Sequence, residues 1–265
     1  MKIVCLKGGL GNQMFEYCRF RDLMESGHDE VYLFYDHRRL KQHNGLRLSD
    51  CFELELPSCQ WGVKLVVWGL KICSAVGVLK RLYDDEKPEA VLIDDYSQHR
   101  RFIPNARRYF FFRQFLAELQ SGFVQMIRAV DYPVSVHVRR GDYLHPSNSS
   151  FGLCGVDYFQ QAIAYVRKKR PDARFFFFSD DMEWVRENLW MEDAVYVEHT
   201  ELLPDYVDLY LMTLCRGHII SNSTFSFWGA YLAVDGNGMK IYPRRWFRDP
   251  TWTSPPIFSE EWVGL

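Results

Sequence analysis

The sequence predicts an α/β fold built on parallel β-sheets. In the second half of the chain, short apolar runs of strand length alternate with segments of helical periodicity. Near the amino terminus, a glycine-rich turn joins an apolar run to a helical pattern, as in a βαβ unit. The length of 265 residues is enough for two such domains, each with helices on both faces of its sheet.

The first 36 residues predict a strand, a tight turn, a helix and a second strand. Residues 3–6 are apolar and short enough for a buried strand, and the glycines that follow permit a tight turn. Residues 12–26 have helical periodicity, which Gly27 ends. We expect the second strand at 31–35, which is rich in aromatic residues.

Periodicity is weaker from residue 36 to about residue 95, where we expect one helix near 61–82. A basic and aromatic stretch at 100–115 leads into a helix that reaches about residue 130. Residues 63–79 are apolar but carry two lysines and are too few to span a bilayer. We expect an amphipathic helix on the protein body there, and a helix that lies on a membrane surface is the alternative.

Strands and helices alternate in the second half of the chain. The expected strands lie at 133–138, 174–178, 194–198, 218–221 and 239–242. The expected helices lie at 157–170, 181–189, 204–215 and 224–234. Asp157 and Gln160 predict a capping box for the first of these helices. This order predicts βαβ units, so two domains that join near 125–133 would face each other across a cleft.

Composition and charge exclude several classes of protein. The 32 basic and 34 acidic residues give a net charge of −2, which argues against a general nucleic-acid coat. The seven cysteines form no CxxC pair and no Cys/His cluster with zinc spacing, so we expect reduced thiols and no metal site. The amino terminus has no apolar run of secretory-signal length, and we expect a soluble, cytoplasmic protein.

Three turns that follow expected strands carry polar residues at the edge where parallel sheets bind ligands. The first is KGGLGNQMF at 7–15, whose glycines and following helix let a ligand approach backbone N–H groups. A tight turn explains the glycines but not the two amides, Asn12 and Gln13. NAD is an alternative ligand because Asp36 occupies the ribose-binding position, but Met14 replaces the third glycine of the dinucleotide fingerprint.

The second turn is VHVRRGDY at 136–143. A guanidinium can hold a phosphate through two parallel hydrogen bonds. Strand alternation puts His137 and Arg139 on one face and Arg140 on the other. One arginine would then reach a phosphate while the other pairs with an acid such as Asp142. A solvated, charged turn is the alternative.

The third turn is SNSTFSFWGA at 221–230, with four hydroxyls in six residues before a helix. Backbone N–H groups and hydroxyls at a helix N-terminus favour an anion. Capping explains one hydroxyl, at Ser221 or Ser223, but not the whole cluster.

A weaker candidate is FSDD at 178–181. Asp180 and Glu183 predict a helix cap, and an Asp at a strand's carboxyl end could instead accept hydrogen bonds from guanine. No Asp-x-Asp sequence occurs, so the usual carboxylate clamp for a metal-bound nucleotide diphosphate is absent. We therefore expect arginine and the helix dipole to neutralise any bound diphosphate.

Taken together, GGLGNQMFEY at 8–17, HVRRGDY at 137–143 and SNSTFSFWGAYL at 221–232 resemble motifs of bacterial α-1,2-fucosyltransferases. The likeness extends from residue 1 to about residue 245 and is weak at 40–120. It implies a fold of the GT-B type, with two Rossmann-like parallel-sheet domains that face a cleft. These would be an acceptor-side domain at 1–130, a GDP-fucose-binding domain at 131–245 and a tail at 246–265.

The resemblance also implies an activity: inverting transfer of L-fucose from GDP-L-fucose to the 2-hydroxyl of a terminal galactose, with no required metal or other cofactor. Arg139 would hold the β-phosphate, His137 would lie beside the nucleotide, and Arg140 would support them. Asp181 would contact guanine. The diphosphate would be cradled by Ser223, Thr224, Phe225 and Ser226.

On the acceptor side, the resemblance implies a turn formed by Gly9, Gly11, Asn12 and Gln13, with Asn12 facing the fucose and the acceptor hydroxyl. Asp142 is the nearest motif carboxylate that could act as a catalytic base, and holding Arg140 is its alternative role. The 40–120 region and the aromatic, basic tail are expected to shape the acceptor pocket.

Two other classes of function fit the sequence. A transferase that uses another nucleotide sugar would keep the fold but lack the guanine contact. A non-catalytic nucleotide- or sugar-binding protein would not need the anion site at Arg139 and 223–226. The expected partners are GDP-L-fucose and a β-galactoside, and no nucleic acid is expected. Peripheral contact with the inner membrane face and the oligomeric state stay open.

Overall fold

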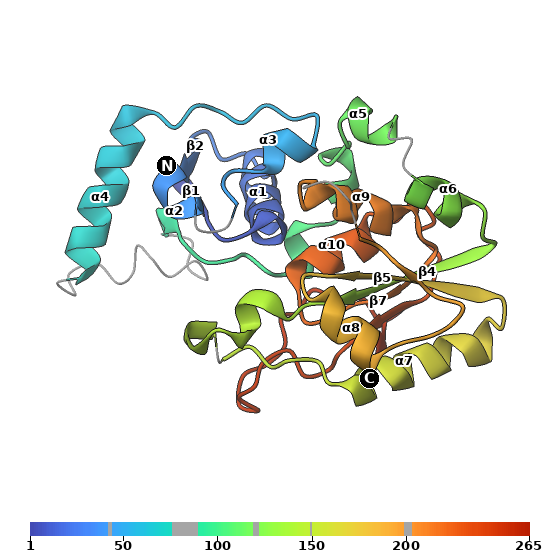
Figure 1. Ribbon diagram of the computed structural model, residues 1–265. Helices are drawn as coiled ribbons and strands as arrows, with labels where there is room; N and C mark the ends of the chain where they lie inside the picture. Colours follow the sequence, from blue (N-terminus) through green and yellow to red (C-terminus); the bar gives the residue numbers. More distant parts are fainter. Residues whose placement is uncertain (42–43, 76–89, 119–121, 149, 199–202) are drawn as a thin grey trace. The chain divides into compact units, whose positions relative to one another are not determined.

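The chain forms two compact units, Met1–Arg113 and Gln114–Leu265, in the computed structural model shown in Figure 1. The structure describes residues 1–41, 44–75, 90–118, 122–148, 150–198 and 203–265. The units divide ahead of α5 (Gln114–Ala117), because α6 (Gly122–Arg128) packs against α9 (Tyr206–Leu214) of the second unit. The sequence analysis divided the chain after residue 130, and its functional assignment of domains stays a prediction.

The first unit contains a three-stranded parallel sheet in the order β2-β1-β3. Its strands are β1 (Lys2–Leu6), β2 (Val31–Tyr35) and β3 (Leu92–Ile93), and α1 (Leu10–Glu25) connects the first two. The predicted β1, α1 and β2 are confirmed to within about two residues at each end. The two-residue β3 was not predicted, because so short a run has no periodicity of its own.

Helix α4 (Trp61–Ala75) is amphipathic, as predicted. Val63 and Val67 are buried against the sheet, whereas Trp61 and Trp68 are 74% and 67% exposed. The rest of the predicted helix, at 76–82, lies outside the described residues. In the described part of the chain, no helix is long and apolar enough to cross a membrane. Docking of α4 on a membrane surface stays a prediction.

Short helices fill the rest of the first unit. They are α2 (His37–Leu40), α3 (Leu48–Cys51) and the 3₁₀ helices η3 (Arg100–Phe102) and η4 (Ala106–Arg108). Phe52 and Phe112 form an isolated antiparallel bridge, which ties the end of this unit back to its middle segment.

The second unit contains a six-stranded sheet in the order β6-β5-β4-β7-β8-β9, and every pairing is parallel. The strands are β4 (Tyr132–Val138), β5 (Ala173–Ser179), β6 (Val195–Tyr196), β7 (Gly217–Ile219), β8 (Lys240–Tyr242) and β9 (Val263–Gly264). The first five confirm the predicted strands. Strand β9 was not predicted, because the tail has no periodicity of its own. Its two residues form a strand by pairing with β8.

Helices cover both faces of this sheet (Figure 1): α7 (Val156–Lys169) and α8 (Met182–Asn188) lie on one face, and α9 and α10 (Thr224–Tyr231) on the other. Residues of β4 and β5 alternate accordingly, since Val134, Val136, Phe175 and Phe177 pack in the core beneath α7. Two 3₁₀ turns, η5 (Gly141–Leu144) and η6 (Pro146–Asn148), follow β4. The predicted α/β fold with parallel sheets is therefore confirmed.

Two predicted helix caps were wrong. Helix α7 begins at Val156, and its N-cap is Gly155, which has no side-chain cap bond. Asp157 thus lies inside the first turn, too late to form the capping box expected with Gln160. The cap of α8 is Asp181 rather than Asp180, and its side chain accepts from the Trp184 backbone N–H.

Gly8 lies at the tightest point of the first turn, with φ at +69°. A methyl group there would meet the Asn12 side-chain nitrogen at 2.7 Å, whereas one at Gly9 would meet nothing within 4 Å. We expect Gly8→Ala to lower the free energy of unfolding by about 1–2 kcal/mol because of the left-handed backbone. Gly9→Ala, with its extended backbone, is the matched control. Urea titration of both variants checks this, and equal losses would contradict it.

Candidate functional site

The predicted site residues of the second unit lie along the carboxyl edge of its sheet. Strands β4, β5 and β7 end level with one another, since Val138 pairs with Ser179 and Val136 with Ile219. The segments that leave these strands carry the arginines, the aspartates and the serine-rich turn. The parallel register thus gathers residues that are far apart in the sequence.

Arg139 is held between two carboxylates. Its guanidinium lies 2.7 Å from Asp142 Oδ1 and 2.8 Å from Asp180 Oδ2. The side chain keeps 33% of its surface exposed. The guanidinium of Arg139 is therefore held in one direction by the two carboxylates and is still partly open to solvent at the sheet edge. The alternative that Asp142 pairs with Arg140 was wrong.

Arg140 points elsewhere and is mostly buried. Its Nε donates to Asp181 Oδ2 at 3.0 Å, and its guanidinium lies 4.0 Å from the centre of the Trp184 ring. Its supporting role toward a donor stays a prediction. Both Asp181 carboxylate oxygens are bonded within the protein, one to Arg140 and one to the α8 cap. A contact between Asp181 and guanine would have to break one of these bonds.

Asp180 is a site residue whose role the sequence analysis missed. Its Oδ1 accepts from the Arg140 backbone N–H at 2.8 Å, while its Oδ2 pairs with Arg139. A Cβ at Gly141 would come within 2.6 Å of Asp180 Oδ2, so any larger residue there would push this carboxylate aside. Asp180 therefore fixes the backbone and the side chain of the arginine turn together. The sequence signal that could have identified Asp180 is its position directly after the expected strand β5.

His137 lies behind the arginines, buried against the serine-rich turn. Its Nδ1 is 3.1 Å from Ser221 Oγ, and its ring is 5.6 Å from that of Phe225. Burial lowers the pKa of His137 to about 4; Asp180 opposes this shift and Arg139 adds to it. The imidazole is consequently neutral at pH 7 and forms part of the floor of the site.

The serine-rich turn serves both structure and site. Ser223 is the N-cap of α10 with extended backbone, but its side chain makes no cap bond. Ser226 Oγ donates to the Ser223 carbonyl at 3.1 Å, so that hydroxyl is used inside the helix. Thr224 and Phe225 are half-buried beside them. Of the four predicted cradle residues, Ser226 thus has an internal role, and the anion contacts of all four stay predictions.

Asn222 in the same turn is a second residue that the sequence analysis did not single out. It is fully buried, and its Nδ2 donates to the carbonyls of Gly152 at 2.6 Å and Trp246 at 2.7 Å. Its own carbonyl accepts from the Tyr143 hydroxyl at 3.0 Å. One amide therefore joins the turn to the loop after β4 and to the carboxyl-terminal tail.

The first unit holds the other predicted turn. Gln13 is fully buried: its Nε2 donates to the carbonyls of Gly8 and Gly45, both at 2.9 Å, and its Oε1 accepts from the Arg47 N–H. All three bonds are internal, so Gln13 holds the turn rather than offering an amide to a ligand. Asn12 is half-buried and accepts from Gln98 Nε2 at 3.0 Å.

Gly9 and Gly11, which the sequence analysis placed in the same acceptor-side turn, both have structural roles at the start of α1. Gly9 is the extended N-cap of α1, and Gly11 is buried in its first turn. The acceptor-side roles of Gly9, Gly11 and Asn12 stay predictions. Asp36, the ribose position of the NAD alternative, accepts from the Arg38 N–H at the start of α2, and Met14 is fully buried.

No group of three or more His, Cys, Asp or Glu side chains in the described ranges is arranged to hold a metal ion. Arg139, Arg140 and the α10 N-terminus lie at this edge of the sheet and could bind an anion. Metal independence stays a prediction.

Comparison with known proteins gives a consistent family. The sequence model described as Glycosyl transferase family 11 matches residues 105–265. Two Escherichia coli proteins align over 98% of this chain: the O-antigen biosynthesis glycosyltransferase WbnK at 25% identity (99% of its length) and an alpha-1,2-colitosyltransferase at 27% (97% of its length). Galactoside 2-alpha-L-fucosyltransferase SEC1 of Bos taurus is 34% identical over 50% of this chain and 38% of its own.

The fold is shared with a solved fucosyltransferase. The crystal structure of NodZ from Bradyrhizobium superimposes with a TM-score of 0.52 at 12% identity, covering 87% of this chain and 92% of that one. The likeness supports the predicted fold of the GT-B type, and the cleft between domains stays a prediction.

The buried histidines make a testable prediction for stability. Burial lowers the pKa of His218 to about 3 and that of His137 to about 4. As the pH drops below about 6.5, these histidines become protonated in the unfolded chain but stay neutral in the folded chain. The free energy of unfolding therefore falls as the pH drops below about 6.5. We expect a loss of about 2 kcal/mol per histidine at pH 5 relative to pH 8. Urea unfolding of His137→Gln should show a smaller pH slope, while the exposed control His28→Gln keeps that of the wild type.

Proposed function

Because this chain belongs to glycosyl transferase family 11 and is a glycosyltransferase, we propose that it transfers L-fucose from GDP-L-fucose to the 2-hydroxyl of a terminal galactose. The transfer inverts the anomeric centre and needs no metal. The motifs of the sequence and the name of the Bos taurus relative, a galactoside 2-alpha-L-fucosyltransferase, support this choice of donor sugar and acceptor.

The observation that carries the proposal is the fixed guanidinium of Arg139 at the carboxyl edge of the sheet. Arg139 directly follows β4, and the ring of His137 in that strand contacts Phe225 in the first turn of α10. Arginine and a helix N-terminus together suit a diphosphate. We assign the donor's β-phosphate to Arg139 and its neighbouring oxygens to the turn at 223–226.

The chemistry requires such a site. When the bond from the fucose anomeric carbon to the β-phosphate oxygen breaks, that oxygen gains negative charge while the sugar ring becomes positive. A fixed guanidinium that faces this oxygen stabilises the transition state more than the ground state. A contact of this kind typically contributes about 3 kcal/mol, or about a hundredfold in rate.

A phosphate that binds Arg139 must compete with two carboxylates. Asp180 is also bonded through its other oxygen to the Arg140 backbone N–H, so it has little freedom to leave. Asp142 lies in the short η5 turn, and 43% of its side-chain surface is exposed. We infer that the phosphate displaces Asp142 and that Asp180 keeps the guanidinium in place.

The displaced carboxylate can then act as the base. The acceptor oxygen attacks the anomeric carbon from the side opposite GDP, and the old glycosidic bond breaks. For the acceptor proton to pass to Asp142, the displaced η5 turn has to carry this carboxylate away from Arg139 to the acceptor side of the sugar. The products are the fucosylated glycan and GDP. General base catalysis of this type contributes about 10²–10⁴ in rate.

A second candidate uses a different donor. One relative that aligns over 98% of this chain is named an alpha-1,2-colitosyltransferase. The anion site argued above would serve a colitosyl nucleotide equally well, because it contacts the diphosphate rather than the sugar. The linkage to a 2-hydroxyl would be the same.

The proposal predicts that the purified chain, with EDTA present, adds one deoxyhexose to lactose when GDP-fucose is supplied. Mass spectrometry of the acceptor measures the product. Transfer only from a colitosyl donor would select the second candidate. GDP binding without any transfer would preserve the donor site and reject the acceptor, and strict dependence on Mn²⁺ or Mg²⁺ would contradict the metal-free mechanism.

Asp142→Asn separates the two roles given to this residue. Removing the competing charge should tighten GDP binding about 2- to 5-fold, because an exposed ion pair is worth about 1 kcal/mol or less. Loss of the base should slow transfer at least about tenfold. Calorimetry and initial rates measure the two effects. Asp193→Asn, which breaks an exposed ion pair with Arg167, is the control and should change neither. Weaker GDP binding by Asp142→Asn would reject the displacement.

A further inference from the structure

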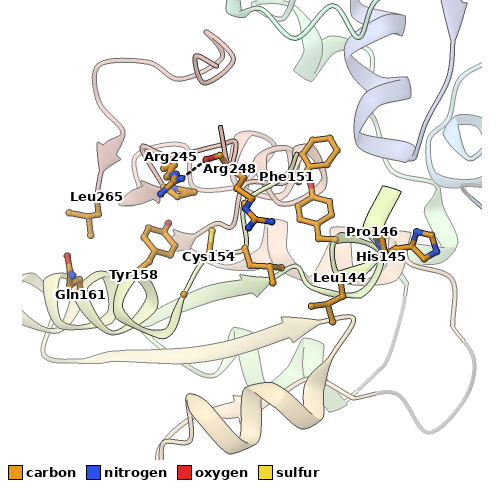
Figure 2. A pocket seen from close by; sticks show the side chains of 15 residues that line it. Leu144, His145, Pro146, Phe151, Cys154, Tyr158, Gln161, Arg245, Arg248 and Leu265 are labelled. Atoms are coloured by element: carbon orange, nitrogen blue, oxygen red, sulfur yellow. Dashed lines mark hydrogen bonds between the residues drawn. The ribbon is translucent and has the colours of Figure 1, made fainter. Parts of the chain in front are cut away.

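A pocket of about 790 Å³ lies beside the arginine turn, within the second unit (Figure 2). It is formed by the loop after β4, the start of α7 and the tail after β8. In the view of Figure 2, Arg245 and Arg248 of the tail lie above it and Tyr158 and Gln161 of α7 below. The volume is in the range of small-molecule sites.

The walls of this pocket are fixed by internal bonds. Asn222 Nδ2 joins Gly152 on the loop wall to Trp246 on the tail wall. Phe151 and Phe247 form an antiparallel bridge between the same two walls, and the Arg248 N–H donates to the Ser150 carbonyl at 2.8 Å. A pocket held this way is organised before a ligand binds, which lowers the entropic cost of binding.

The pocket adjoins the donor site through one residue. The Tyr143 ring lines the pocket, and the Arg139 guanidinium lies 5.8 Å from the centre of that ring. The Tyr143 hydroxyl is bonded to the Asn222 carbonyl, and its ring stacks on Phe151 at 4.9 Å. Tyr143 thus lines the pocket and also lies next to Arg139 of the arginine turn.

The charge of the lining is one-sided. Arg245 and Arg248 line the pocket, and none of the side chains of the described residues that line it is acidic. Arg245 donates to the carbonyls of Phe247 and Arg248, which fixes its guanidinium on the tail wall. The Arg248 side chain is exposed beside it. Leu144, Leu153 and the stacked pair Tyr143 and Phe151 add apolar surface, so the lining suits an anion attached to a partly apolar body such as a sugar ring.

We propose that this pocket is an acceptor subsite for an anionic sugar, one that carries a carboxylate or a phosphate next to the galactose that receives the fucose. This inference rests on the proposed function, since it places the acceptor beside the Arg139 donor site. Arg248 contacts the anion, and the aromatic wall contacts the sugar ring. The enzyme accordingly prefers acidic to neutral β-galactosides.

Three acceptors with the same galactose test the preference: lactose, lactobionate (a carboxylate) and lactose 1-phosphate. We expect kcat/KM to be about tenfold higher for at least one of the anionic acceptors than for lactose. A gain with lactobionate identifies a sugar acid, and a gain with lactose 1-phosphate alone identifies a sugar phosphate. Equal values for all three would overturn the proposal.

Variants of Arg248 assign the preference to the pocket. Arg248→Gln should abolish most of the ratio between anionic and neutral acceptors, and Arg248→Glu should invert it. Arg174→Gln is the matched control, because Arg174 is exposed at the amino end of β5, on the opposite edge of the same sheet. A ratio unchanged in both Arg248 variants would overturn the proposal. Thermal unfolding checks that each variant is folded.

Equilibrium binding distinguishes this inference from the proposed function. Calorimetric titration with lactobionate and lactose 1-phosphate, with GDP present, measures the affinity of these sugars for the protein when no transfer can occur. Binding that depends on Arg248 in a protein that transfers no fucose would reject the proposed function and keep an anionic sugar site. Fucose transfer with no such binding would keep the proposed function and reject the subsite.

Discussion

The register of β4 between β5 and β7 is the constraint on which the site depends. Because these strands are parallel and end level, the residues that follow them meet at one edge of the sheet. Arg139 meets Asp180 only because Val138 pairs with Ser179. A shift of β5 by one residue would turn each of its side chains to the other face and separate this pair.

Charge balance at this edge explains how one turn can be both stable and reactive. The two arginines face three carboxylates, those of Asp142, Asp180 and Asp181. Asp180 and Asp181 are tied to backbone groups as well as to arginines, whereas Asp142 lies in an exposed turn. The partners of a phosphate-binding arginine thus differ in mobility, and the proposed mechanism uses that difference.

Much of the fold could be predicted from local patterns. Periodicity identified β1, α1, β2 and most elements of the second unit, because each buries a face of regular spacing. It missed β3 and β9, which are two residues long and exist as strands only through their partners. It also misplaced the caps of α7 and α8, since α7 begins at a glycine with no side-chain cap and two adjacent aspartates, Asp180 and Asp181, precede α8.

The sequence by itself determined which residue types stand at the strand ends, and so the class of chemistry: arginine and a helix N-terminus for an anion, in motifs typical of one transferase family. Only the tertiary structure decided their partners. Arg139 forms ion pairs with Asp142 and Asp180, and the Gln13 side chain donates to the carbonyl of Gly8 in its own turn. The Asn222 side chain donates to the carbonyls of Gly152 and Trp246, in two loops far apart in the sequence. Pairings of this kind depend on distances between segments remote in the sequence, and no local pattern encodes those distances.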